Sequence, residues 1–478
     1  MSVLGHLEPK KVFGFFEEMS AIPHGSYNNT AISNWLVKFA ADRGLEHYQD
    51  KAENVIIIKP ATPGYEQAEP VIIQGHMDMV CEKAADCAKD MAKEGLDLAV
   101  DGDYVFAKGT TLGGDDGIAV AMGLALLDSD DVAHPRLEVV ITTDEEVNMG
   151  GATELDASVL RAHRMLNIDS EEEGVFTVSC AGGANADIAV PVKRECFAGA
   201  VATIAVDGLI GGHSGMEIHK GRGNADMILG RILFAVSQET ALRVIRVDGG
   251  LKGNAIAAAA KAVVVTEDVA ALKRVCGEMA AILKAEYAVT DPGICVTVSD
   301  GGEGAAMDEE STRRVIGLLT CAPNGVQVMS ADVAGLVQTS LNLGILYTEE
   351  DTVHAQFCIR SSVDSEKEMM KQRMVCLAQL LGGECHLGSD YPGWAYRQDS
   401  ALRELMTEIY VEQYGAQPRI EAIHAGLECG LFAGKIADLD CVSFGPNLLD
   451  IHTPRERMSI SSVQRTWAFV VELLRRMK

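Results

Sequence analysis

The feature that most constrains this chain is a set of short, branched apolar runs separated by segments with helical spacing. Strand-like runs occur at 54–60 (NVIIIKP), 70–75 (PVIIQG), 136–143 (RLEVVITT) and 164–168 (RMLNI). A helical pattern follows at 115–128 (DDGIAVAMGLALLD). Strands that are apolar along their whole length suit a sheet covered on both faces. The alternation therefore predicts an α/β domain with a largely parallel, mixed sheet flanked by helices.

The pattern changes near residue 186 and returns near residue 389. Between these points, strands with alternating faces and helices form two successive strand–helix–strand sets, which predict one inserted α+β domain of roughly doubled size. A chain of 478 residues is long enough for two domains. We therefore expect a split catalytic domain over 1–185 and 389–478, with the second domain inserted over 186–388.

Histidine and acidic residues follow the strand-like runs of the split domain. They are His76 and Asp78 after VIIQG, Glu145 and Glu146 after LEVVITT, Asp169 after RMLNI, His452 shortly after DCVSFGP, and Asp115 at the start of the 115–128 helix. A single H-x-D or DEE is more often a solvated turn. Ligands of open α/β sheets bind beyond the carboxyl ends of the strands, so recurrence after several strands favours a metal site.

The number of these side chains indicates how many ions the site holds. Two histidines and three carboxylates are too many for one tetrahedral zinc ion that keeps an open position. They suit two divalent ions about 3.5–4 Å apart, bridged by one carboxylate and a water. The charges also balance, because two doubly charged ions offset three carboxylates and one hydroxide.

Eight motifs extend the interpretation to a family. They are GHMDMV, GTTLGGDDGIAVAM, TTDEEVNMGG, NIDSEEEG, GGHSGMEIHKGRGNA, YPGWAY, IHAGLECGLF and GPNLLDIHTPRERMSI. Together they resemble the bacterial aminoacyl-histidine dipeptidases, the cytosolic non-specific or carnosinase-like branch of the co-catalytic zinc peptidase and aminoacylase superfamily. The resemblance covers nearly the whole chain. It implies a cytoplasmic metallopeptidase that hydrolyses dipeptides, including those with a C-terminal histidine.

The resemblance also implies roles in the split domain. His76 and Asp169 match ligands of the first ion, Glu146 and His452 match ligands of the second, and Asp115 matches the bridging aspartate. Asp78 matches the aspartate that orients the metal-bound histidine, and Glu145 matches the general base. Zinc is the expected ion. Manganese and cobalt stay open because Asp116 stands where the family commonly has asparagine.

In the inserted domain, the resemblance implies a lid that also forms a homodimer. His213 matches the residue that stabilises the oxyanion, with His219 as an alternative. Asn254, Arg360 and Gly426 match substrate contacts, and an arginine fork suits a dipeptide's free carboxylate. Without the family, these residues would be read as turn or surface residues.

The net charge of the chain limits which partners it can bind. A net charge of −28 argues against nucleic acid and anionic membrane surfaces, since both would be repelled. The first twenty residues predict a helix rather than an export signal. Two other functions stay open: an N-acyl-amino-acid deacylase with the same site, and a non-catalytic scaffold that keeps the metals.

Overall fold

The computed structural model describes residues 2–478, which form two compact units. Unit 1 joins the chain up to Ser179 with Tyr396–Ala422 and Leu427–Lys478, and unit 2 consists of Cys180–Ala395 and Ile423–Gly426. Each unit has its own apolar core. No helix within residues 2–478 is long and apolar enough to cross a bilayer. The expected limits at 185/186 and 388/389, and the lid and dimerisation roles, stay predictions.

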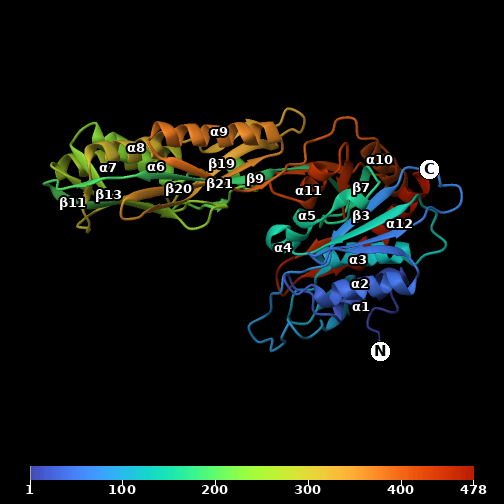
Figure 1. Cartoon of the computed structure of the whole chain (residues 1–478). Coiled ribbons are helices and arrows are strands. Elements are labelled where there is room, and N and C mark those ends of the chain that lie inside the picture. The colour runs from blue at the N-terminus through green and yellow to red at the C-terminus, as the bar shows by residue number, and fades with distance from the viewer. Residues whose placement is uncertain (1) are drawn as a thin grey trace. The chain divides into compact units, whose positions relative to one another are not determined.

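Unit 1 is built on an eight-stranded mixed sheet (Figure 1). In spatial order its strands are β1 (Glu46–Gln49), β2 (Val55–Lys59), β6 (Leu137–Thr142), β3 (Val71–His76), β7 (Arg164–Asn167), β23 (Asp440–Ser443), β8 (Val175–Cys180) and β22 (Arg419–Ile423). The central strands β6, β3, β7 and β23 are parallel, while β1, β2 and β8 pair antiparallel. The predicted α/β class with a largely parallel, mixed sheet is confirmed.

Helices cover this sheet. They are α1 (Lys10–Ser20), α2 (Thr30–Asp42), α3 (Gly114–Leu127), α4 (Glu145–Asn148), α5 (Gly150–Glu154), α10 (Ala401–Tyr414), α11 (Glu428–Lys435) and α12 (Ile460–Arg476). Helix α3 packs against β3, α2 packs against β1 and β2, and α1 packs against α3 (Figure 1). All residues of α3 are buried, as are all of β3 and β6. Complete burial is the reason that their sequences are apolar without a polar face. A small second sheet contains β24 (Leu448–Leu449), β25 (Arg457–Ser459), β5 (Tyr104–Ala107) and β4 (Leu98–Asp101).

Unit 2 is an antiparallel sheet of nine strands with helices packed against it. In spatial order the strands are β16 (Cys295–Asp300), β11 (Ala200–Asp207), β15 (Ala260–Thr266), β13 (Leu242–Gly250), β19 (Val337–Thr348), β20 (Thr352–Ser361), β9 (Gly182–Pro191) and β21 (Glu384–Tyr391), with β18 (Gly325–Met329) paired to β19. Its helices are α6 (Ala225–Ser237), α7 (Val269–Glu286), α8 (Glu309–Cys321) and α9 (Asp364–Leu380). Figure 1 shows the four helices on one face of the sheet.

The doubled size of unit 2 comes from two sets with the same topology. One set runs β11–α6–β13–β15–α7–β16, and the other runs β9–α8–β19–β20–α9–β21. In both, the spatial order of the strands is fourth, first, third, second, and the two second strands, β13 and β19, pair with each other. The expectation of successive sets was wrong. The first set is nested inside the second, after β9, because β9 pairs with β20 and β21 rather than with β11.

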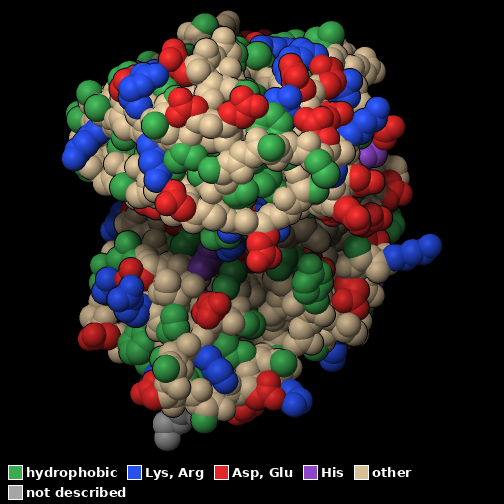
Figure 2. Space-filling view, turned by 90° about the vertical axis from the view of Figure 1, so that its left-hand side faces the viewer, with side chains coloured by type: hydrophobic (Ala, Val, Ile, Leu, Met, Phe, Trp, Pro, Cys, Tyr) green, Lys and Arg blue, Asp and Glu red, His purple; other side chains and the backbone are tan. Residues whose placement is uncertain are grey.

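Short connections complete the fold. They are the paired strands β12 (Gly212–His213) and β14 (Ala255–Ile256), the paired strands β10 (Arg194–Glu195) and β17 (Ala306–Met307), and the 3-10 turns Ala157–Val159 and Ile218–Lys220. Figure 2 shows acidic and basic side chains interspersed over one face of the molecule.

Candidate active site

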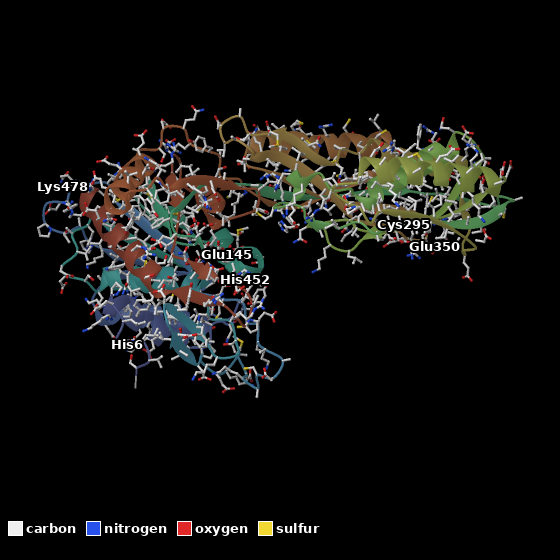
Figure 3. All side chains as sticks on the ribbon, turned by 180° about the vertical axis from the view of Figure 1, so that it is seen from behind. His6, Glu145, Cys295, Glu350, His452 and Lys478 are labelled. Carbon is white, nitrogen blue, oxygen red and sulfur yellow. The ribbon has the colours of Figure 1, made fainter. Side chains whose placement is uncertain are left out.

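The ends of three parallel strands place most of the predicted site residues of unit 1. β3 ends at His76, β6 leads through a short turn to Glu145 and Glu146 on α4, and β7 leads to Asp169. Strands β6, β3 and β7 are adjacent and parallel, so their carboxyl ends lie at one edge of the sheet. Asp115 comes from the start of α3, and His452 follows β24. Figure 3 shows Glu145 and His452 in the same part of unit 1.

Asp115 lies between two groups of candidate ligands. Its Oδ1 is 3.3 Å from His76 Nε2, and its Oδ2 is 3.2 Å from His452 Nε2. On the first side, Asp169 Oδ1 is 3.5 Å from His76 Nε2. On the second side, Glu146 Oε2 is 3.0 Å from His452 Nε2. Ligand atoms about 2.1 Å from one tetrahedral ion lie about 3.4 Å from each other, so these four histidine–carboxylate distances are those expected between two ligands of one ion.

Asp116 also approaches His76. One ligand atom each from His76, Asp116 and Asp169 lie within 4.8 Å of one another, and the same holds for His76, Asp115 and Glu146. However, Asp116 Oδ2 is 3.3 Å from the backbone N of His76 and accepts its hydrogen bond. That oxygen is therefore occupied by a hydrogen bond to the backbone at the end of β3. We therefore group His76 with Asp115 and Asp169 for ion binding, and treat Asp116 as a support of β3.

The carboxylates and histidines perturb one another strongly. Burial alone would raise the pKa of Asp115, but hydrogen bonds from His452 and His76 hold it well below its usual range. Burial raises the pKa of Asp169 to about 7. Hydrogen bonds that His452 donates to Asp115 and Glu146 raise its pKa to about 10. This concentration of buried negative charge favours bound cations, and its mixed imidazole and carboxylate donors fit divalent zinc, manganese or cobalt.

Asp78 connects a candidate ligand to the candidate base. His76 Nδ1 donates to the backbone carbonyl of Asp78 at 2.9 Å, and Asp78 Oδ1 is 3.5 Å from the same nitrogen. Asp78 Oδ1 also accepts the backbone N–H of Glu145 at 3.0 Å, and Oδ2 accepts Ser26 Oγ at 2.7 Å. A hydrogen bond at Nδ1 leaves Nε2 free to bind an ion. Burial raises the pKa of Glu145 well above its usual range.

In unit 2, Arg360 and His213 approach the same small space. A Cβ on Gly215 would lie 2.3 Å from the backbone carbonyl oxygen of His424, which leaves room only for glycine, and 3.0 Å from His213 Cε1 and 3.2 Å from Arg360 Nε. Arg360 is 7% exposed. Its Nη1 is 3.5 Å from the Tyr391 hydroxyl, its Nε has no hydrogen-bond partner, and it makes no ion pair with any carboxylate of residues 2–478. A buried guanidinium without a counter-charge is costly, which suggests that an anion binds there.

The hydrogen bonds of His213 define its tautomer. The backbone N–H groups of Gly215 and Met216 both point at Nδ1, at 3.2 and 3.0 Å. Nδ1 is therefore the acceptor and Nε2 carries the proton. Burial and the Arg360 charge lower the pKa of His213, which keeps it a neutral donor. His219, the alternative, is exposed and lines a separate cavity with Arg222 and Tyr287.

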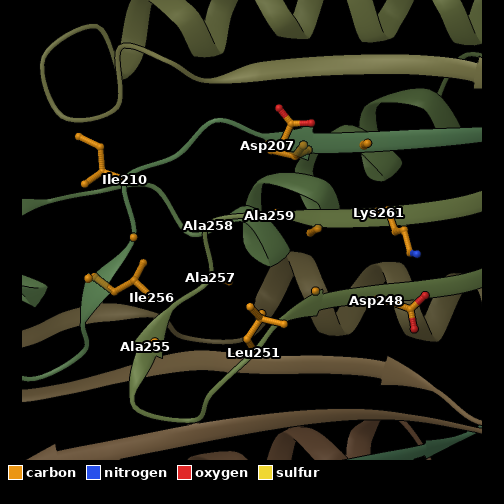
Figure 4. A pocket seen from close by; sticks show the side chains of 17 residues that line it. Asp207, Ile210, Asp248, Leu251, Ala255, Ile256, Ala257, Ala258, Ala259 and Lys261 are labelled. Atoms are coloured by element: carbon orange, nitrogen blue, oxygen red, sulfur yellow. The ribbon is translucent and has the colours of Figure 1, made fainter. Parts of the chain in front are cut away.

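The other predicted contacts of unit 2 are less closely connected. Asn254 is exposed, and its backbone carbonyl accepts the N–H of Ser214, the residue after His213. Gly426 ends the segment Ile423–Gly426 that belongs to unit 2. Residues close to Asn254 in the sequence help to line an apolar cavity of about 560 Å³. Its lining includes Ile210, Leu251 and Ala255–Ala260 (Figure 4). None of the predicted site residues lines it.

Sequence reasoning missed two buried residues of the IHAGLECG motif. His424 Nε2 lies 2.7 Å from Ser340 Oγ, on the strand paired with the one that carries Arg360, and burial lowers its pKa to about 3. Glu428 is fully buried in unit 1, and burial raises its pKa to about 7. A glutamate and a histidine inside an otherwise apolar and small-residue motif are the signal that would have found them.

The chain is similar to several known peptidases. The chain matches peptidase family M20/M25/M40 over residues 72–476. It is 38% identical over 481 residues to the cytosol non-specific dipeptidase of Escherichia coli (strain K12), covering 99% of both chains. The crystal structure of aminoacylhistidine dipeptidase from Vibrio alginolyticus superposes with a TM-score of 0.95 at 36% identity, covering 99% of this chain and 98% of that one. Aminopeptidase PepT from Bacillus cereus shares the fold, with a TM-score of 0.56 at 17% identity and coverage of 99% and 100%.

Proposed function

Since this chain belongs to peptidase family M20/M25/M40, we propose that it is a metal-dependent dipeptidase whose substrates include dipeptides with a C-terminal histidine. The expected family is confirmed by the full-length similarity to the Escherichia coli and Vibrio alginolyticus enzymes. The names of those two relatives supply the substrate class. The name of the Escherichia coli relative also supports a cytosolic location for this chain.

The observation that carries the proposal is the position of Asp115. Its two oxygens face two different histidines, at 3.3 and 3.2 Å, and each histidine has one further carboxylate beside it. This arrangement fits two divalent ions that share one carboxylate. We propose zinc as the ion, with manganese and cobalt as alternatives. Such ions, when bound, supply Lewis acidity for the scissile carbonyl and acidify a water molecule.

The remaining steps fall to side chains of the chain. Glu145 is the proposed general base, which takes the proton of the attacking water and returns it to the leaving amine. Asp78 holds Glu145 through its backbone N–H and fixes the tautomer of His76. His213 Nε2–H is the proposed donor to the oxyanion. Arg360, which lacks an acidic partner within residues 2–478, is the proposed reader of the substrate's terminal carboxylate.

Three further assignments belong to the proposal. Asn254 and Gly426 are proposed substrate contacts. The segment 186–388 is proposed as an inserted lid through which two chains form a homodimer. Sedimentation of the purified protein at twice the chain mass of 51.1 kDa is the expected result. A dimer that persists after charged substitutions on the exposed surface of 186–388 would contradict the proposed interface.

A substrate panel tests the function. Metal-stripped protein is reconstituted with zinc, manganese or cobalt and assayed with Xaa-His dipeptides, other dipeptides, tripeptides and N-acetyl amino acids. We expect hydrolysis of dipeptides, dependent on added metal and on a free α-amine. Preferential hydrolysis of N-acetyl amino acids would instead establish a deacylase. Metal binding without hydrolysis of any compound would establish a non-catalytic scaffold.

A further inference from the structure

A layer of buried polar side chains lies behind the candidate ligands in unit 1. Gln74, Thr142 and Asn167 come from the carboxyl-terminal halves of β3, β6 and β7, and each is at most 1% exposed. These three strands lead to His76, to Asp169, and to Glu145 and Glu146. Polar side chains in a core are retained only where they find partners, so their partners reveal what they do.

All three side chains connect to Glu428. Asn167 Nδ2 donates to Gln74 Oε1 at 2.5 Å, and Gln74 Nε2 donates to Glu428 Oε2 at 2.5 Å. Thr142 Oγ1 donates to the same carboxylate oxygen at 2.7 Å. Every donor in the chain points toward the carboxylate, which fixes the orientation of the Gln74 amide and strengthens each bond through its neighbour.

The positions of these residues relate the layer to the candidate ligands. Gln74 precedes His76 by two residues, so both side chains lie on the same face of β3. Asn167 pairs with Gln74 in the strand register, and Thr142 pairs with His76. A shift of one of these strand ends therefore moves a ligand or the residues that follow it. Glu428 is the one acceptor that Gln74 and Thr142 share.

We propose that Glu428 is a positioning residue of the metal site: it holds the ends of β3, β6 and β7 in the arrangement that ion binding needs. Glu428 is fully buried at the first residue of α11, where the helix dipole favours an acidic side chain. It does not act as a base on substrate, because its carboxylate is not exposed. The inference rests on the proposed metal-dependent function, but its test reads metal affinity rather than peptide hydrolysis.

The matched variants are Glu428→Gln and Glu428→Leu. Glutamine keeps an acceptor oxygen for Gln74 and Thr142, whereas leucine fills the space and removes their carboxylate acceptor. The longer contacts from Gln74 Nε2 to Thr142 Oγ1, at 3.3 Å, and from Thr142 Oγ1 to the backbone carbonyl of Gly75, at 3.4 Å, would remain. Zinc affinity is measured by competition with a chromophoric chelator at neutral pH, together with thermal unfolding of the metal-free proteins. We expect Glu428→Leu to weaken zinc binding by roughly 10–100-fold, the usual effect of losing a partner behind a metal ligand. Glu428→Gln should bind zinc nearly as tightly as the unmodified chain.

Glu138 provides a control on the same strand. It is fully buried near the opposite end of β6, where it accepts hydrogen bonds from Arg136 and from the backbone of Arg161 and Ala162. Glu138→Leu should lower thermal stability but leave zinc affinity unchanged. If Glu138→Leu weakens zinc binding as much as Glu428→Leu, the effect is general loosening of the sheet and the proposal fails.

Two further outcomes decide the question. Unchanged zinc affinity in Glu428→Leu, or equal losses in the leucine and glutamine variants, would overturn the proposal. If Glu428→Leu does not fold, Thr142→Val removes one donor at nearly constant shape and should give a smaller loss of zinc affinity; no loss in that variant would overturn the proposal. Absence of dipeptide hydrolysis by the unmodified chain would refute the proposed function without affecting this test.

Discussion

Asp226 is a buried carboxylate that should make the stability of unit 2 depend on pH. It lies in the first turn of α6, is fully buried, and neither of its oxygens has a hydrogen-bond partner within residues 2–478. Burial is the cause that raises its pKa, to about 8 from the usual 3.8. Below pH 4 the acid is protonated in both the folded and unfolded chains. Below pH 4, Asp226 therefore does not reduce the free energy of unfolding. As the pH rises toward 8 it reduces the free energy of unfolding progressively, because only the unfolded chain ionises freely.

The size of the effect follows from the shift. A difference of about four pKa units, at about 1.4 kcal/mol for each unit, gives a penalty of roughly 6 kcal/mol above pH 8. Asp226→Asn keeps the shape of the side chain and removes the ionisation. The gain in stability from this substitution should therefore grow by roughly 3–4 kcal/mol between pH 5 and pH 8. The measurement is unfolding by urea, monitored by circular dichroism, at several pH values and at one constant concentration of free metal ion.

Asp291 is a matched control in the same unit. It is also fully buried, but it accepts the backbone N–H groups of Ile210 and Gly223, both at 2.8 Å. In Asp291→Asn, an amide NH2 group replaces one acceptor oxygen and faces a backbone N–H group. The substitution should therefore destabilise the protein throughout this pH range. A difference between Asp226→Asn and the unmodified chain that stays constant from pH 5 to pH 8 would refute the argument. Lower stability of Asp226→Asn at pH 8 would refute it as well.

Three predictions concern the proposed site. Glu145→Gln should lower kcat by roughly 10²–10⁴-fold with metal content unchanged, whereas Glu146→Gln should lose one of the two ions; near-normal turnover in Glu145→Gln would exclude it as the base. Elemental analysis of the active protein should find two divalent ions per chain, and full activity with one tight ion would contradict the shared role of Asp115. Arg360→Met should lower kcat/KM for a dipeptide by an amount that corresponds to on the order of 2–5 kcal/mol of activation free energy, and should lower it much less for the dipeptide amide. Equal losses on both substrates would show that Arg360 does not bind the carboxylate.

Local patterns determined the class of the fold and the composition of the candidate site. Apolar runs such as 70–75 predicted buried strands, and β3, with every residue buried, is one. The rule that ligands gather beyond strand ends predicted that His76, Asp115 and Asp169 share one edge of the sheet. Asp115 and Asp169 indeed both lie within 3.5 Å of His76 Nε2. The strand prediction succeeds because the hydrophobic period is a local property of a few residues. The shared edge follows because adjacent parallel strands end on the same side of a sheet. The catalytic roles of these residues stay predictions until the variants are measured.

Contacts between distant segments were decided only by the tertiary structure. The sequence could not show that one strand–helix set of unit 2 is nested inside the other, because strand pairing depends on which edges meet, not on order along the chain. It also gave no indication that Glu428 accepts a hydrogen bond from Gln74, 354 residues away. Nor did it show that Arg360 is buried with no acidic partner among residues 2–478. The sequence shows which side chains can carry a charge, but the burial and the partners of each side chain depend on packing. Those two quantities set the pKa of Asp226 and the proposed role of Glu428.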